Sequence, residues 1–328
     1  MRRRASYSSD MFFLPFKADF PLARFPWLTT LVCIVCLGVF LNQQSNWQKY
    51  ETAIYAYCNA PKSRITRIVF GRISGLEGED ACIDVVFGIA NSPDEEQEIE
   101  NMASRMRPLS GFSPEDSQIY VKDMLAEELR YYKRRVPDNP NDGLAYYTDS
   151  WNPLTMVTSA FAHADWSHIL FNLIFFIAFA GAMEVLIGTG WFIAAFVAIC
   201  LFTGAFSSVS AIASAQHFPT LGLSGVVMGM IGLFAYLLPS GNIRCAYWFV
   251  VFVGTIAVPA WILALWFIGG DLYKLFAHDD HGMINVMAHV TGGIAGYAFG
   301  VIFLRKIRWE TRILQSEFAR DKLRAEIR

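Results

Sequence analysis

The sequence predicts an all-α membrane protein that crosses the bilayer six times and carries one large hydrophilic insertion. Of its 328 residues, 54% are hydrophobic and only 17% are charged, whereas soluble domains carry about a quarter charged residues. The charges are also placed unevenly. Residues 168–304 contain six of them, while residues 45–150 contain 12 Lys/Arg and 18 Asp/Glu. This pattern excludes an ordinary soluble enzyme, a disordered chain and a nucleic-acid-binding protein.

Six apolar runs approach the length of about 20 residues that crosses a bilayer. They lie at 25–43, 168–187, 191–212, 223–239, 245–268 and 285–304. The fourth run is short and rich in glycine, and we interpret the first as a signal anchor. An even number of crossings puts both termini on one side, and the Lys/Arg excess beside the first and last spans indicates the cytoplasm. We therefore expect a multi-pass protein of a bacterial inner membrane with both termini cytoplasmic.

The spans divide the chain into five parts. These are a cytoplasmic segment 1–24, a first membrane helix 25–43, an extracytoplasmic loop domain 44–150, a membrane core 151–304 and a basic cytoplasmic tail 305–328. The loop domain predicts helices at 45–57 and 114–135, and the second is preceded by the cap residue Ser113 with Pro114 in its first turn. The loop domain also contains Cys58 and Cys82, which can pair in an oxidising compartment.

Four polar side chains occur within the apolar runs, where they are costly and therefore candidates for function. His168 and Asn172 lie four residues apart on one face of the second span, Ser224 opens the fourth span, and His289 lies in the sixth. The three spans enter the membrane from the same side, so these groups share one level near the outer ends of their helices. Taken singly, each has a structural explanation, such as a serine bonded to its own helix or an interfacial histidine.

Together, these groups are typical of an acyl-transfer site. A serine hydroxyl becomes a nucleophile when a neighbouring base takes its proton, and His289 can do so for Ser224. The oxyanion that follows needs hydrogen-bond donors, which His168, Asn172 and the free N–H groups at a helix start can supply. We find no carboxylate within the spans to complete a triad. Asn285 can orient the imidazole, or it is a plain helix-start residue.

Glycine and alanine repeat at spacings of about four residues in the fourth and sixth spans. The set comprises Gly225, Gly229, Gly232, Ala288, Gly292, Gly296 and Gly300. Such stripes let two membrane helices approach closely. Close approach of these two spans is what a contact between Ser224 and His289 requires.

Residues 151–304 resemble the catalytic core of the rhomboid intramembrane serine proteases. The matching motifs are Thr158–His163, His168–Asn172, Gly181–Glu184 with Gly188, Gly222–Gly225, and Ala288–Gly292 with Gly296. The resemblance implies a six-transmembrane-helix rhomboid bundle with a large extracytoplasmic insertion in its first loop. It also implies that Ser224 and His289 form a catalytic dyad, that His168 and Asn172 help to form the oxyanion hole, and that His163 and Glu184 are structural. The sequence departs from the family by lacking a Trp-Arg pair near Thr155 and by having Met228 where many members have an aromatic residue.

The expected function is that of a serine endopeptidase that cleaves transmembrane segments near the outer bilayer face. The expected partners are transmembrane protein substrates and the lipid bilayer, with no nucleic acid, no cofactor and no metal. His278–His281 has metal-ligand residue types but more often such a run is solvated loop. The alternative is an inert rhomboid-like protein that binds membrane clients. A transporter would instead show charges at mid-membrane or two similar halves, which this sequence lacks. The loop domain is expected to recognise substrates or an unknown partner, or to act as a stabilising cap.

Overall fold

The computed structural model describes residues 12–18, 24–92, 94–214, 219–249, 252–276 and 283–313. This part of the chain is mostly helical and divides into two compact units, one of residues 1–40 and 144–328 and the other of residues 41–143. The first helix, α1 (Trp27–Asn59), contributes residues to both units. We call the first unit the membrane unit and the second the loop unit.

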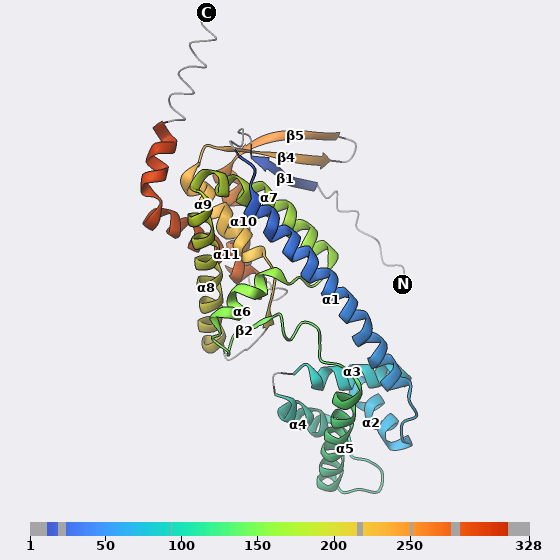
Figure 1. Ribbon diagram of the computed structural model, residues 1–328. Coiled ribbons are helices and arrows are strands. Elements are labelled where there is room, and N and C mark those ends of the chain that lie inside the picture. The colour runs from blue at the N-terminus through green and yellow to red at the C-terminus, as the bar shows by residue number, and fades with distance from the viewer. Residues whose placement is uncertain are drawn as a thin grey trace, which may run out of the picture. The chain divides into compact units, whose positions relative to one another are not determined.

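The membrane unit is a helical bundle with a small sheet at one end and short segments at the other (Figure 1). The bundle is built from the start of α1, α7 (Trp166–Ile187), α8 (Thr189–Ser214), α9 (Ser224–Leu237), α10 (Ala260–Phe276) and α11 (Met283–Phe303). The short segments are β2 (Tyr146–Tyr147), α6 (Pro153–Thr158), a 3-10 turn at Ser159–Phe161 and β3 (Pro219–Thr220). Within the described residues, α1, α7, α8 and α11 are long and apolar enough to cross a membrane, while α9 and α10 are shorter apolar helices.

The expectation of a fifth span at 245–268, and with it a purely helical fold, is wrong. The first part of this run forms β4 (Asn242–Phe249) and β5 (Phe252–Pro259), and α10 begins only at Ala260. Strand β4 pairs in antiparallel fashion with β5 on one side and with β1 (Phe12–Ala18) on the other, so the sheet order is β1-β4-β5 (Figure 1). Hydropathy alone does not separate a buried strand from a buried helix, and here β-branched and aromatic residues favour the strand.

The predicted close approach of the fourth and sixth spans is confirmed by the contact between α9 and α11. A Cβ added to Gly292 would overlap the backbone carbonyl oxygen of Gly225, and one added to Gly296 would overlap that of Gly229. On α9, a Cβ added to Gly232 would likewise overlap the backbone of α11. The two helices therefore touch backbone to backbone, which only glycine permits at these positions.

Glu184 ties the end of α7 to the start of α1, in agreement with its expected structural role. Its buried carboxylate accepts hydrogen bonds from the backbone N–H groups of Leu28 (3.0 Å) and Thr29 (2.7 Å), and from the Thr29 hydroxyl (2.8 Å). Arg24 donates to the Glu184 carbonyl oxygen at 3.2 Å. The carboxylate thus caps N–H groups that have no partner within α1, at the helix end whose dipole favours a negative charge.

The loop unit packs four amphipathic helices around the end of α1. They are α2 (Arg64–Ser74), α3 (Gly78–Ala90), α4 (Glu95–Arg105) and α5 (Pro114–Arg135). The prediction of a helix at 114–135 is confirmed, and Ser113 caps it by accepting from the Asp116 N–H. The separate helix expected at 45–57 is instead the continuation of α1, because no proline interrupts the sequence between Trp27 and Asn59.

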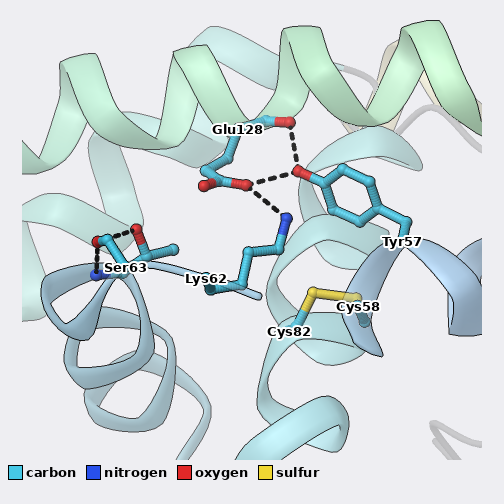
Figure 2. A network of polar contacts seen from close by, with 7 residues as sticks. Tyr57, Cys58, Lys62, Ser63, Cys82 and Glu128 are labelled. Carbon is cyan, nitrogen blue, oxygen red and sulfur yellow. Dashed lines mark hydrogen bonds and ion pairs between the residues drawn. A yellow bond between two sulfur atoms is a disulfide. The ribbon is translucent and has the colours of Figure 1, made fainter. Parts of the chain in front are cut away.

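The core of the loop unit is fastened by a disulfide and a polar network, which Figure 2 shows. Cys58 and Cys82 form the disulfide that the sequence allowed, which joins the end of α1 to α3. The Tyr57 hydroxyl donates to the Glu128 carboxylate at 2.6 Å, and Lys62 forms an ion pair with the same carboxylate at 2.9 Å. The Lys62 ammonium also lies 3.5 Å from the centre of the Tyr57 ring. Every polar group of this network has a partner.

Candidate active site

The four side chains predicted to act together line one cavity of about 320 Å³ in the membrane unit. His168 and Asn172 reach it from α7, Ser224 from the start of α9 and His289 from α11. The remaining walls are mostly apolar and consist of Ser167, Phe171, Phe175, Val227, Met228 and Phe267. An apolar cavity with a few converging polar groups is the usual form of a site that binds a small molecule or a peptide segment.

Ser224 is the first residue of α9, and the start of this helix lacks a side-chain cap. The residue before it, Leu223, provides no cap hydrogen bond. The first N–H groups of a helix have no partner within the helix, and the helix dipole adds positive potential at this end. The Ser224 hydroxyl therefore lies beside backbone donors suited to an anionic oxygen.

His168 is held at the start of α7 by the loop before it. Asp165 caps this helix by accepting from the His168 N–H at 2.8 Å, and the Ser167 hydroxyl also donates to that carboxylate. These two bonds lower the pKa of Asp165 and keep it ionised. The Ala164 N–H points to Nδ1 of the His168 ring at 3.4 Å. This contact favours the tautomer with its proton on Nε2, which makes Nε2 a hydrogen-bond donor.

Gly222 leaves room for the His168 ring beside the loop that precedes Ser224. Its φ is +120°, and an added Cβ would lie 2.8 Å from His168 Nε2 and 2.7 Å from its Cε1. Its N–H donates to the Ser159 carbonyl at 2.9 Å, which holds the loop in place. A side chain at this position would displace the imidazole of His168. This clash explains why the Gly222–Gly225 motif begins with glycine.

Asn172 lines the cavity, and its amide nitrogen is buried. It lies one turn after His168 and is 6% exposed. Among the described residues, its Nδ2 has no hydrogen-bond partner. A buried donor without a partner costs free energy, and this cost is understandable where the donor serves a bound group.

His289 has a partner that the sequence analysis missed. Its Nδ1 lies 2.6 Å from Oδ2 of Asp271, which is 8% exposed on α10. The expectation that no carboxylate stands near the site is therefore wrong. It failed because the predicted fifth span ended at residue 268, whereas α10 continues to Phe276. Between Ser224 and His289 the described residues show no direct hydrogen bond, and such contacts are often long before substrate binds.

His163 packs behind His168 and is almost fully buried, as a structural residue should be. The two ring centres lie 5.2 Å apart in an edge-to-face arrangement. Burial, and to a smaller extent the neighbouring His168, lower the pKa of His163 to about 4, so its ring is neutral at neutral pH. A neutral ring avoids placing a second positive charge beside His168.

A second, smaller cavity of about 50 Å³ is also lined by Ser224. Its wall carries several hydroxyl groups, from Tyr146, Ser159, Thr203, Ser207 and Thr220. A cavity needs about 10–15 Å³ to hold one water molecule, and ordered water requires polar partners. This cavity meets both conditions.

Among the described residues, no three His, Cys, Asp or Glu side chains are placed to hold a metal ion. The possible metal ligands at His278–His281 lie outside the described residues, and so does the side chain of Asn285.

Comparison with known proteins identifies the membrane unit. Residues 150–306 match the rhomboid domain. The chain is 23% identical over 210 residues to the mitochondrial presenilin-associated rhomboid-like proteins of Mus musculus and Homo sapiens, which is 60% of this chain and 52% and 51% of theirs. It is 24% identical over 155 residues to mitochondrial rhomboid protein 1 of Saccharomyces cerevisiae, covering 45% of this chain and 41% of that protein. The chain thus spans about half the length of these relatives.

These relatives correct one expectation and support another. A bacterial inner membrane is the wrong location, and the assignment of the termini to a bacterial cytoplasm is withdrawn with it, because the matching curated proteins are mitochondrial. Positive charge beside a span reports orientation but not the kind of membrane. The matched region coincides with the motifs quoted from the sequence, and residues 150–306, just under half of the chain, form a rhomboid domain.

Proposed function

We propose that this protein is an intramembrane serine endopeptidase that cleaves membrane-spanning segments of other membrane proteins. The observation that carries the proposal is the convergence of Ser224, His289, His168 and Asn172 on one cavity from three separate helices. An inert client-binding relative would have no need of a nucleophile, a base and two oxyanion donors around the same space.

The first half of the reaction forms an acyl-enzyme. The Ser224 oxygen attacks the carbonyl carbon of the scissile peptide bond while His289 Nε2 takes the hydroxyl proton. The carbonyl oxygen becomes an oxyanion, which accepts hydrogen bonds from Asn172 Nδ2, His168 Nε2 and the N–H groups at the start of α9. The C–N bond then breaks, and His289 delivers its proton to the leaving amine.

The second half consumes water. His289 takes a proton from a water molecule, whose oxygen attacks the acyl carbon, and the Ser224–acyl bond breaks with return of the proton to Ser224 Oγ. The small hydroxyl-lined cavity beside Ser224 is suited to hold this water. It shares only Ser224 with the lining of the large cavity, in which we propose that the substrate binds.

The proposed membrane arrangement has six crossings, formed by α1, α7, α8, α9, α10 and α11. Four of these helices are long enough on their own, and the short α9 and α10 complete the bundle around the site. Because the curated relatives are mitochondrial, the membrane we propose is a mitochondrial one. The cut then falls near the membrane face at which α7, α9 and α11 begin.

Substrate segments must unwind at the cut. A helical peptide bond keeps its carbonyl hydrogen-bonded within the helix and shields it from attack. Small or helix-breaking residues near the scissile bond should therefore favour cleavage. The described residues that line the cavity all belong to the membrane unit, and we propose that the loop unit recognises substrates or a partner and takes no part in the chemistry.

The experiment is cleavage of a single-span reporter by the purified protein in proteoliposomes, with the cut mapped by mass spectrometry. We expect Ser224→Ala and His289→Ala each to abolish turnover, and the double variant to be no worse, because residues that act as one unit are not additive. Asn172→Ala should retain partial activity, since one oxyanion donor contributes about 3–4 kcal/mol or less.

The matched control is Ser104→Ala, which removes an exposed hydroxyl of the loop unit and should cleave as the unmodified protein does. Full activity of Ser224→Ala would refute the serine mechanism. A cut at the opposite membrane face would refute the proposed topology.

A further inference from the structure

The contact between Asp271 and His289 extends the proposed mechanism and rests on it. We propose that Asp271 is a positioning residue, which fixes the ring and tautomer of His289 and stabilises the imidazolium that forms during the reaction. The site would then work as a serine–histidine–aspartate set in which the acid comes from α10.

The contact determines which nitrogen of His289 can act as a base. An ionised carboxylate only accepts hydrogen bonds, so a 2.6 Å contact places the proton of a neutral imidazole on Nδ1. Nε2 is then unprotonated and can take the proton of Ser224. With the opposite tautomer, Nε2 would carry a proton already and could not act as a base.

The contact between Asp271 and His289 should also become stronger during the reaction. In the proposed mechanism, His289 Nε2 is unprotonated before Ser224 attacks, so the ring beside Asp271 carries no charge at that stage. Once His289 has taken the proton of Ser224, the two groups form a buried ion pair of opposite charges. An interaction that is stronger in the transition state than in the ground state accelerates the reaction.

The helix packing shows that this contact belongs to an ordered interface. Ile268, three residues before Asp271, packs so closely on Gly293 that an added Cβ there would lie 2.5 Å from the Ile268 Cδ1. Gly293 lies four residues after His289. One face of α10 thus meets one face of α11 in antiparallel register, with Ile268 on Gly293 and Asp271 on His289. The register places the carboxylate at the ring.

A purely structural role is the alternative, in which the pair merely fastens α10 to α11. The two roles differ in what they predict. A structural fastener affects folding whether or not His289 is present, and it affects substrate binding and turnover together. A positioning residue acts through His289 alone and affects turnover.

The test compares Asp271→Asn, Asp271→Glu and the matched control Asp149→Asn, which changes an exposed carboxylate of the same unit. Proteoliposomes are assayed for kcat and KM on the single-span reporter, for the rate at which a fluorophosphonate labels Ser224, and for the midpoint of thermal unfolding. We expect Asp271→Asn to lower kcat by about 10²–10⁴-fold with KM changed less than about threefold, as for the acid of a serine triad. Asp271→Glu should recover part of kcat.

The decisive measurement repeats Asp271→Asn in the His289→Ala background. If Asp271 acts through His289, the second substitution should change the residual labelling of Ser224 by less than about twofold. A kcat for Asp271→Asn within about twofold of the unmodified protein would overturn the inference. So would loss of folding by Asp271→Asn in both backgrounds, because the carboxylate would then serve the fold.

The two proposals fail in different ways. If the unmodified protein neither cuts the reporter nor is labelled at Ser224, the proposed function is wrong. If it does both and Asp271→Asn equals it, the proposed function stands and only the role of Asp271 is wrong.

Discussion

The loop unit and the candidate active site of the membrane unit differ in how their buried polar groups are satisfied. In the loop unit such groups satisfy one another, as in the hydrogen bond of 3.0 Å between the Tyr50 and Tyr132 hydroxyls and the network around Glu128. Asn172 lines the cavity of the membrane unit, and among the described residues its buried amide nitrogen has no hydrogen-bond partner. Satisfied networks stabilise and specify a fold, whereas an open donor costs free energy unless a ligand meets it.

The backbones differ as well. The helices of the loop unit pack through bulky side chains and are held by a disulfide. In the membrane unit, α9 and α11 approach so closely at glycines that their backbones touch. Such packing is expected in lipid, where burying apolar side chains between helices contributes little free energy. We therefore expect substitutions in the active site to leave the stability of the loop unit unchanged. We also expect the geometry of the active site to depend on the spacing of α9 and α11.

The largest effect should come from widening the contact between α9 and α11. In Gly296→Val the new side chain would overlap the carbonyl oxygen of Gly229, so the helices must separate, and we expect a loss of about 4 kcal/mol or more. Thermal unfolding and Ser224 labelling would both report it. Gly38→Ala, where an added Cβ meets nothing within 4 Å, is the control and should be neutral. Normal labelling of Gly296→Val would contradict the idea that the site depends on helix spacing.

The next effect concerns the loop unit alone. Replacing both Cys58 and Cys82 with serine opens a loop with a sequence separation of 24, which should cost about 3 kcal/mol by the loop-entropy estimate. Limited proteolysis of residues 41–143 should speed up, while cleavage of a generic reporter stays normal. Cys33→Ala, at a free cysteine, is the control. Loss of reporter cleavage in the double variant would show that the units are not independent.

Acid should weaken the membrane unit through His163. Its pKa is about 4 in the folded protein, below the ordinary value of about 6.5. The folded state therefore binds fewer protons between these values, so stability falls as the pH drops below about 6.5, by about 2 kcal/mol at pH 5. Unfolding midpoints at pH 7.5 and pH 5 would measure it, and His163→Asn should reduce the difference. An equal difference in both proteins would assign the acid sensitivity to other groups.

The smallest effects separate two ion pairs of the loop unit. The side chains of Lys62 and Glu128 are only 11% and 17% exposed, whereas those of Lys122 and Glu100 are 38% and 55% exposed. Lys62→Met should cost about 1–3 kcal/mol because it leaves a part-buried carboxylate without its cation, and Lys122→Met about 0.5 kcal/mol or less. Urea unfolding of the two variants gives the values. Equal losses would mean that burial does not decide the strength of these pairs.

Much of the fold and of the site could be predicted from the sequence. Long apolar runs set α1, α7, α8 and α11, since each carries its own length and polarity signal. The convergence of Ser224 and His289 followed from helix direction and from glycine spacing, both of which are local in the sequence.

What could not be predicted depends on distant parts of the chain. The strands β4 and β5 are as apolar as a span, and their sheet is completed by β1, more than 200 residues earlier. Mistaking them for a helix moved the fifth span toward the N-terminus and left Asp271 outside it. The position of Asp271 depends on where α10 begins. No pattern in the sequence around Asp271 therefore predicts its contact with His289.

The three-stranded sheet also sets the depth of the reaction. Its edge strands, β1 and β5, have backbone groups that lipid cannot satisfy, so this end of the bundle must lie at water. From there α9 runs 14 residues back to Ser224, a rise of about 21 Å when upright in a hydrocarbon layer of about 30 Å. In the proposed membrane arrangement, Ser224 would lie about 9 Å beneath the opposite surface. A substrate peptide bond would have to reach that depth, and each water molecule consumed would have to reach it too, so the cavity would have to admit water as well as the peptide.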